Sequence, residues 1–259
     1  MKKLLLSFAT LLTSMAVFGQ TIVFQENFDP PSLADSVTST GTPTWAIDNT
    51  LSVSTPNSMG NQVGLSTSNF LETNTFSTVG NTFVILEFSH ICKIEFFDAG
   101  TIEVSNDGGT TWTQLTCPQY LGAGTFCQSG NKFASNAYLV WDPANPGPVP
   151  INTWWQNESF DVSTLLANTA QAKVRFKLQD GNNSGASGNY GWLIDDIKVT
   201  AAPSELNPPV VTLNAPVLLG GVSNTGPFTI SADITDASGI DTAMVIYSFN
   251  GAPDDTVGM

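Results

Sequence analysis

Apolar and polar residues alternate along this chain in short runs that predict β-strands and very little helix. The clearest run is Lys173–Leu178, in which three apolar side chains alternate with two lysines and an arginine. This pattern predicts a strand with one buried face and one wet face. The run Phe83–Ile91 is more continuously apolar, which favours a central strand that is covered on both faces. Because such runs recur between Gly, Asn, Asp, Ser and Pro, we expect an all-β protein.

Two strand-like segments, Thr101–Ser105 and Thr111–Leu115, flank the residues Asn106–Gly109. These intervening residues tolerate positive φ, so the segments are expected to form a hairpin. The stretch Ser105–Trp112 also matches the Asp-box pattern S-x-D-x-G-x-T-W of sialidases and related propellers, where the Asp and Thr side chains close a hairpin turn. A propeller needs several blades, and the chain contains one copy of the pattern. We therefore interpret it as a structural hairpin.

The run Trp192–Thr200 is strand-like but changes phase in the middle. Its apolar residues before Asp195 and those after it fall on opposite faces of a regular strand. A β-bulge near Asp195 brings the two sets onto one face. The sequence therefore predicts a bulged strand at this position.

The chain begins with two lysines, an apolar run Leu4–Phe18 and then Gly19. This order is typical of a secretory signal peptide. The run is shorter than the ~20 apolar residues of a membrane-spanning helix, and no later stretch approaches that length. We expect residues 1–19 to be cleaved and the mature protein, starting at Gln20, to be secreted or held at the cell surface.

A proline-rich stretch, residues 204–209, follows the last strong strand and is interpreted as a linker. It separates a first domain, residues 20–203, from residues 210–259. The second region contains three strand-like runs, Val210–Leu213, Phe228–Ile234 and Ala243–Phe249. An immunoglobulin-like sandwich takes about 100 residues, so we expect a partial immunoglobulin-like domain and a fragment of a longer protein.

The composition is strongly acidic, with 22 acidic and 8 basic residues and a net charge of −14. Loss of Lys2 and Lys3 with the signal peptide changes the net charge to −16. Such a surface repels nucleic acid and anionic lipid. The carboxylates are also the ligands that calcium prefers, although acidity alone can serve to keep an extracellular protein soluble.

Three cysteines and one histidine limit the chemistry of the chain. Cys117 and Cys127 flank a glycine-containing loop and are the expected disulfide pair, whereas Cys92 follows an apolar strand and is interpreted as a buried free residue. One histidine gives little support to a zinc site, and His90 lies inside the apolar strand, which favours a structural role. The chain lacks H-E-x-x-H, G-x-S-x-G and P-loop motifs, so the sequence supports no catalytic site.

Several segments occur in an order that resembles one known family. They are Glu26–Asp29, Trp45, Ile85–Phe88, Glu103–Trp112, Glu158–Val162, Val174–Phe176 and Gly191–Ile197. The order resembles that of the MAM-like, or choice-of-anchor, jelly-roll domain of large secreted bacterial proteins, including those exported by type IX secretion and those that accompany immune inhibitor A-type metallopeptidases. The resemblance implies a two-sheet jelly-roll sandwich, similar to galactose-binding domains, with a noncatalytic adhesive or accessory role.

The resemblance also implies a structural calcium ion. In such domains an acidic residue of the first strand and an Asp at the start of the last segment often share the ion, which points to Glu26 and Asp195. Calcium takes six to eight oxygens, so backbone carbonyls and Asp29 or Asp196 are expected to complete the shell. The alternative is a solvated acid pair at a strand end.

Five aromatic residues in or near Gly-, Asn- and Pro-rich segments are candidates for stacking on a sugar ring. They are Tyr120, Trp141, Trp154, Trp155 and Tyr190. Trp154 and Trp155 are the best candidates, because adjacent strand residues point to opposite faces and one of the pair is then exposed. The alternative for each is a core or loop anchor.

These observations favour a noncatalytic extracellular binding or adhesion module for a glycan or a protein, with no nucleic-acid partner and no transmembrane segment. The alternative is an N-terminal accessory domain of a secreted peptidase or glycosidase whose catalytic domain lies beyond Met259. A free-standing hydrolase has the least support, because the sequence alone cannot place two carboxylates at the spacing that glycoside hydrolysis requires.

Overall fold

The structure is a computed structural model that describes residues 20–31, 35–62, 64, 66–95, 97–141, 149–181, 190–203, 210–214, 231–235, 244–247 and 255–258. The expected signal peptide, residues 1–19, and the expected linker, residues 204–209, lie outside the described residues. The chain divides into two compact units, one comprising Phe18–Ser204 and the other containing Glu205–Met259.

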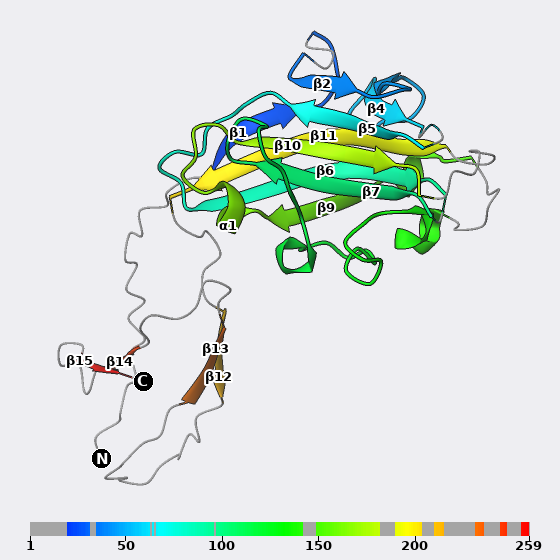
Figure 1. Ribbon diagram of the computed structural model, residues 1–259. Helices are drawn as coiled ribbons and strands as arrows, with labels where there is room; N and C mark the ends of the chain where they lie inside the picture. The colour runs from blue at the N-terminus through cyan, green and yellow to red at the C-terminus, as the bar shows by residue number, and fades with distance from the viewer. Residues whose placement is uncertain are drawn as a thin grey trace, which may run out of the picture. The chain divides into compact units, whose positions relative to one another are not determined.

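The first unit is a sandwich of two antiparallel sheets (Figure 1). The six-stranded sheet contains β1 (Thr21–Glu26), β3 (Ala46–Asp48), β4 (Ser58–Asn61), β6 (Phe83–Lys93), β9 (Gln156–Asp161) and β11 (Gly191–Ala202). The five-stranded sheet contains β2 (Val37–Thr40), β5 (Ser68–Thr73), β7 (Ala99–Ser105), β8 (Thr113–Gln114) and β10 (Lys173–Gln179). Helical segments are short: α1 (Ser163–Leu166) and 3₁₀ turns at Cys117–Gln119, Ser135–Ala137, Leu139–Trp141 and Asn152–Trp154.

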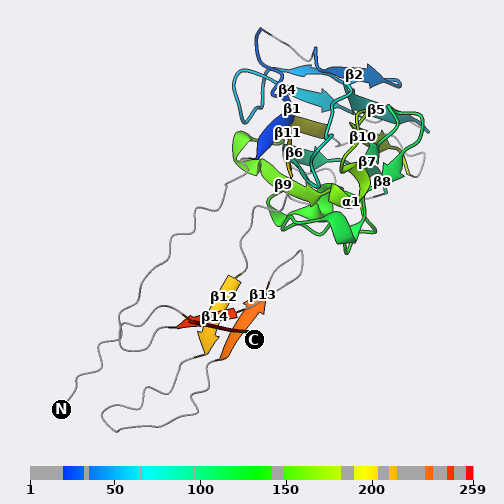
Figure 2. The same ribbon diagram turned by 90° about the vertical axis from the view of Figure 1, so that its left-hand side faces the viewer.

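The strand order is that of a jelly roll. The two sheets have the orders β3-β4-β11-β6-β9, with β1 also paired to β11, and β2-β5-β10-β7-β8. The last two strands of the unit insert between earlier ones: β10 lies between β5 and β7, and β11 lies between β4 and β6 (Figure 2). Because the chain passes repeatedly from one sheet to the other, it wraps both layers in the double-sheet manner of jelly rolls. The expected all-β jelly-roll sandwich is confirmed.

The two strands expected from periodicity alone are both present. In β10 the alternate residues Val174, Phe176 and Leu178 are fully buried, and the basic residues between them are partly exposed. Strand β6 lies between β11 and β9 and is buried along most of its length. The one-sided and two-sided hydrophobic patterns thus predicted the two environments correctly.

The expected bulge in β11 is also present. The pairing of β11 with β6 shifts register between Asp195 and Lys198, and Asp196 has a positive φ of 49°. The extra residue moves the apolar side chains that follow it back to the interior, so that Trp192, Ile194 and Ile197 are all fully buried.

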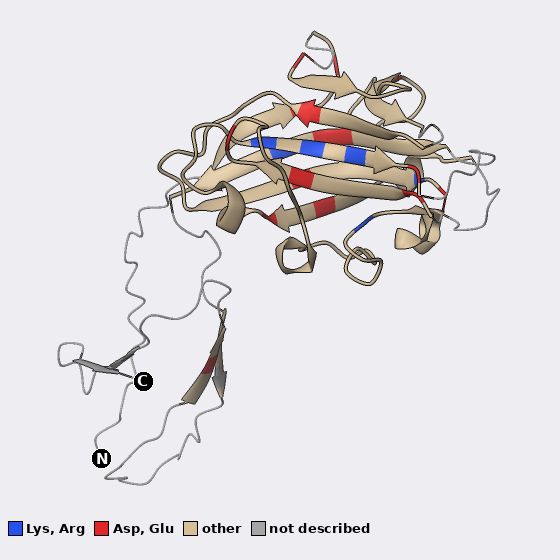
Figure 3. Ribbon diagram, in the orientation of Figure 1, with Lys and Arg blue, Asp and Glu red and all other residues tan. Residues whose placement is uncertain are grey.

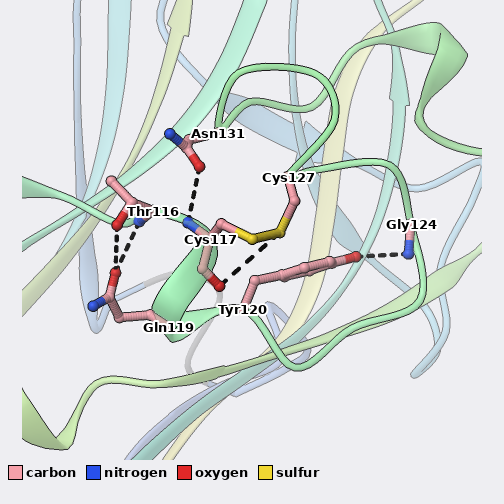
Figure 4. Close-up of a disulfide and its surroundings, with 7 residues drawn as sticks. All are labelled: Thr116, Cys117, Gln119, Tyr120, Gly124, Cys127 and Asn131. Atoms are coloured by element: carbon pink, nitrogen blue, oxygen red, sulfur yellow. Dashed lines mark hydrogen bonds between the residues drawn. A yellow bond between two sulfur atoms is a disulfide. The ribbon is translucent and has the colours of Figure 1, made fainter.

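A disulfide closes a loop beside strand β9. Cys117 and Cys127 are bonded with a Cα–Cα distance of 4.9 Å, the pairing expected from the sequence (Figure 4). The backbone N–H of Leu121, inside the loop, donates to the carbonyl of Ser159 at 2.9 Å. The loop therefore covers the outer edge of β9, an edge that would otherwise present unpaired backbone groups. Cys92 is free and buried, and burial raises the pKa of its thiol.

In the second unit the structure describes two antiparallel strand pairs. Strands β12 (Val210–Asn214) and β13 (Ser231–Thr235) form one pair, and β14 (Met244–Tyr247) and β15 (Asp255–Gly258) form the other. The first three overlap the strand-like runs expected from the sequence. The immunoglobulin-like assignment of residues 210–259 stays a prediction. Across the described residues, no helix is long and apolar enough to span a membrane.

Candidate functional site

The outward face of the five-stranded sheet carries two rows of side chains that are polar except for Phe70. The first row contains Thr38, Glu72, Arg175, Glu103 and Gln114, and the second contains Thr40, Phe70, Lys177 and Thr101. Residues that face each other across antiparallel strands share one side of the sheet. We call the residues of these two rows the polar face.

Arg175 occupies the centre of the polar face, between two acids and two aromatic rings. Its Nε donates to the Glu103 carboxylate, and its Nη1 lies 3.7 Å from Oε1 of Glu72. The guanidinium carbon lies 4.7 Å from the ring centroid of Phe70 and 4.1 Å from that of Trp112. Figure 3 shows the basic residues of β10 flanked by acidic residues of β5 and β7. Ion pairs and cation–π contacts together hold this partly exposed cluster in one geometry.

Trp112 is positioned by the Asp-box hairpin. Its indole N–H donates to the carbonyl of Gly109 at 3.0 Å. The Asp107 carboxylate accepts the backbone N–H and the hydroxyl of Thr111, and also the hydroxyl of Ser105. These hydrogen bonds, those from Thr111 first, lower the pKa of Asp107 to about 2. The segment is a closed structural hairpin, as expected, and it fixes a tryptophan beside the polar face.

A small hollow lies next to this hairpin and is lined mainly by polar residues. It has a volume of about 100 Å³ and is lined in part by Ser105, Thr111, Thr113 and Thr164. Small-molecule sites are typically about 300–1,000 Å³. This hollow is therefore too small for a sugar chain, and the open polar face is the better candidate for an extended ligand.

The structure corrects the prediction that Trp154 is a candidate for stacking on a sugar ring. Trp154 ends a 3₁₀ turn and Trp155 precedes β9, so the expected strand alternation does not apply to them. Trp154 is 8% exposed, and its carbonyl accepts the indole N–H of Trp141 at 2.8 Å. Because its ring is packed in the core, it cannot stack on a ligand. Trp155 is partly exposed and donates to Asn152 at 3.3 Å, so it stays a candidate.

The other stacking candidates differ in exposure. Trp141 is fully buried, which removes it from the set, whereas Tyr190 is 37% exposed and Tyr120 is partly buried. Tyr120 accepts the backbone N–H of Gly124 at 2.7 Å inside the disulfide loop (Figure 4). Tyr120 therefore anchors the loop.

Glu26 and Asp195 lie on neighbouring strands. Glu26 of β1 pairs with Ile197 of β11, two residues from Asp195. The Glu26 carboxylate accepts the backbone N–H groups of Phe28 at 2.8 Å and Ser36 at 3.2 Å. The first and last strands of the domain are thus adjacent, but each carboxylate is held by its own set of donors.

Asp195 is fully buried and accepts four hydrogen bonds. The donors are the backbone N–H groups of Val53, Ser54 and Asp196 and the hydroxyl of Ser54, at 2.7 to 3.3 Å. Burial raises the pKa of Asp195 to about 7. With these donors in place Asp195 has no acceptor position left for a cation, and no cluster of three or more His, Cys, Asp or Glu is found within the described part of the chain. A calcium ion fits here only if the donors move, so calcium stays a prediction.

His90 belongs to a buried polar network. Its Nε2 lies 3.1 Å from Oε1 of Glu158, and both side chains are fully buried. The indole N–H of Trp192 donates to its Nδ1 at 3.1 Å, and the hydroxyl of Tyr138 donates to Glu158 at 2.7 Å. Because Nδ1 is an acceptor, the ring proton sits on Nε2 and is donated to Glu158. This enclosed arrangement agrees with the structural role expected for His90.

The sequence analysis did not identify the polar face. The alternation in Lys173–Leu178 predicted that the basic residues of this strand face solvent, and this was the one sequence signal for the polar face. Glu72 lies about 100 positions and Glu103 about 70 positions before Arg175 along the chain, and only the strand register brings the three residues together. A local sequence pattern contains no information about contacts between residues that are distant in sequence.

No protein-family model matches this chain, and no curated protein matches its sequence. Similar solved structures include the CBM22-1 xylan-binding domain of Paenibacillus barcinonensis Xyn10C, with 9% identity and a TM-score of 0.43 over 73% of this chain and 100% of that one. Another is Caldicellulosiruptor saccharolyticus CBM27-1 in complex with mannohexaose, with 14% identity and a TM-score of 0.43 over 72% of this chain and 98% of that one.

A third similar structure is the K1 cleaved adhesin domain of Lys-gingipain from Porphyromonas gingivalis W83. It has 12% identity and a TM-score of 0.37 over 68% of this chain and 96% of that one. TM-scores below 0.5 leave the ligand and the activity of this chain open. The jelly-roll assignment rests on the strand order.

Proposed function

We propose that the sandwich domain is a noncatalytic extracellular binding module that holds a glycan chain across the polar face. The observation that carries the proposal is the partly exposed cluster around Arg175, which fixes two carboxylates, a guanidinium and two aromatic rings on the outward face of one sheet. Sugars present hydroxyl edges and apolar ring faces. Charged and amide side chains form hydrogen bonds with the hydroxyl groups, and aromatic rings pack against the apolar ring faces.

The dimensions of the polar face suit a chain rather than a single sugar. Neighbouring strands lie about 4.8 Å apart, so five strands span about 19 Å from the first to the last. Both rows cross at least four of these strands and end in hydroxyl or amide side chains, Thr38 and Gln114 in one row and Thr40 and Thr101 in the other. In the first row, hydrogen-bonding side chains thus continue across all five strands.

Three further elements belong to this proposal. The order of basic, apolar and small residues in residues 1–19 supports export through a signal peptide. The segment order from Glu26–Asp29 to Gly191–Ile197 supports a relationship to the MAM-like domains of secreted bacterial proteins. A calcium ion shared by Glu26 and Asp195 belongs to the same relationship and requires the donors around Asp195 to rearrange.

A glycan array probed with the secreted chain tests the proposal. We expect one or more oligosaccharides to bind, and we expect Arg175→Ala to weaken the binding of each by about tenfold or more, because residues at the centre of an interface carry most of the energy. Lys198→Gln is the matched control, since Lys198 forms an ion pair with Glu87 on the other sheet at 2.8 Å. Binding that survives Arg175→Ala, or no binding to any glycan, contradicts the proposal.

A further inference from the structure

Six basic residues lie in the described part of this acidic chain, and five of them have a partner within the protein. Lys173 and Lys198 form ion pairs with Glu72 and Glu87, Arg175 pairs with Glu72 and Glu103, Lys132 donates to the carbonyl of Asp98, and Lys93 is buried and also has an interaction partner. Lys177 is the exception: within the part of the chain that the structure describes, its ammonium has no ion pair and no hydrogen bond. Lys177 is thus the one basic side chain of the described residues whose charge no protein group neutralises.

Lys177 lies in the second row of the polar face, where no acid is available to it. Its cross-strand neighbours are Phe70 on β5 and Thr101 on β7. The two acids of the adjacent row, Glu72 and Glu103, are already engaged by Arg175. No described protein group therefore accepts a hydrogen bond from the Lys177 ammonium, and the partly exposed ring of Phe70 lies on the neighbouring strand.

We propose that Lys177 forms an anion subsite of the polar face and that the bound glycan is an acidic one, with the carboxylate of a uronic acid paired to the Lys177 ammonium. This inference rests on the proposed function and specifies its ligand. A lysine ammonium is a compact point charge that pairs with an oxyanion through charge-assisted hydrogen bonds. Phe70, the partly exposed cross-strand neighbour of Lys177 on β5, offers an apolar surface to the same sugar ring.

The surrounding charge limits how acidic the ligand is. Glu72 and Glu103 flank the site, and the mature chain has a net charge of −16. A densely charged polyanion such as nucleic acid or a heavily sulfated glycan is repelled by this field. A glycan in which neutral sugars separate the carboxylates can pair one carboxylate with Lys177 while its neutral sugars lie beside Glu72 and Glu103.

Paired ligands that differ only in charge test the inference. The probes are oligosaccharides of galacturonate, glucuronate and mannuronate, each compared with its methyl ester by titration calorimetry on the secreted chain. For the oligosaccharide that binds, we expect the free acid to bind about tenfold more tightly than its ester, which corresponds to one charge-assisted contact. Because the contact is ionic, this preference is expected to shrink as sodium chloride is raised from 0.05 to 0.5 M, concentrations at which screening increases (Debye length about 10 Å at 0.1 M).

Two variants test whether the preference for the free acid over the ester depends on Lys177. Lys177→Gln is expected to bind acid and ester with equal affinity, and Lys198→Gln, on the other sheet, is expected to retain the full preference of the wild type for the acid. If Lys177→Gln keeps the preference, or if the wild type binds the ester as well as the acid, the inference is overturned but the proposed function stands. If neither form binds and the glycan array is also negative, both fail.

Discussion

Arg175 and Asp195 are ionisable residues on the central strands of the two sheets, and their surroundings differ in kind. Arg175 of β10 is partly exposed, and its charge is balanced by Glu72 and Glu103. Asp195 of β11 is fully buried, and its carboxylate is balanced by N–H and O–H groups. The cluster around Arg175 is partly exposed to solvent, whereas every acceptor position of the Asp195 carboxyl group is engaged inside the protein. This contrast is why we place binding at Arg175 and a structural role at Asp195.

The largest expected effect follows the removal of the buried carboxylate. Asp195→Ala leaves the backbone N–H groups of Val53 and Ser54 without acceptors, which is expected to cost about 3 kcal/mol and to lower the melting temperature by about 6–12 °C. Asp195→Asn keeps one acceptor oxygen and is expected to lose less. Thermal unfolding followed by circular dichroism measures both. A loss from Asp195→Ala no larger than that from Arg175→Met breaks the comparison.

Calcium binding provides a second test of the contrast between Arg175 and Asp195. If a calcium ion occupies the Glu26 and Asp195 region, the wild type melts at a higher temperature in calcium than in chelator, by the equivalent of about 2.7 kcal/mol at a hundredfold excess over Kd. Asp195→Ala is then insensitive to calcium. Differential scanning calorimetry of both proteins in the two buffers is the measurement. Equal wild-type melting temperatures remove calcium and leave Asp195 as a hydrogen-bonded carboxylate.

The cluster around Arg175 is expected to contribute less to stability than to binding. Partly exposed ion pairs stabilise proteins by about 0.2–1 kcal/mol, so Arg175→Met is expected to lower the melting temperature by no more than about 4 °C. The methionine keeps an apolar stem against Phe70 and Trp112 but removes the charge. Glycan affinity of the same variant, measured in parallel, is expected to fall by about tenfold or more. A large drop in stability with unchanged affinity reverses the roles assigned to the two residues.

The smallest effect concerns a second buried carboxyl. Asp98 is 1% exposed, and its pKa is raised from 3.8 to about 6, mainly by burial and further by the charges of Asp180 and Glu95. Because the folded state binds this proton more tightly than the unfolded state, Asp98 favours folding below about pH 4, and this contribution is lost as the pH rises from about 4 to 6. Asp98→Asn lacks the titration.

The measurement is the melting temperature of the wild type and Asp98→Asn at pH 4, 5, 6 and 7. We expect the wild type to lose stability relative to the variant between pH 4 and 6 and the difference to be constant above that range. A constant difference over all four values shows that Asp98 does not titrate there. Burial would then not raise the pKa of the Asp98 carboxyl group in the way that we infer for Asp195.

The sequence determined the elements whose signals are local. The alternation in Lys173–Leu178, the turn residues Asn106–Gly109 and the phase slip at Asp195 each predicted a feature that the structure contains. Each signal depends on whether neighbouring side chains point to the same side of a strand, and the backbone period of two fixes this within a few residues. The disulfide pair is similarly close in sequence, ten positions apart.

Tertiary structure alone decided which of these elements meet. Glu72, Glu103 and Arg175 come from three strands that are distant in sequence, and the register between those strands forms the cluster. Trp154 looked like a surface residue in a polar segment, but a 3₁₀ turn directs it into the core. Register and burial are set by the packing of the two sheets as a whole, because a strand shifted by one residue would turn its apolar side chains to water. The sequence therefore determined the strands, and the packing of those strands determined the candidate binding surface.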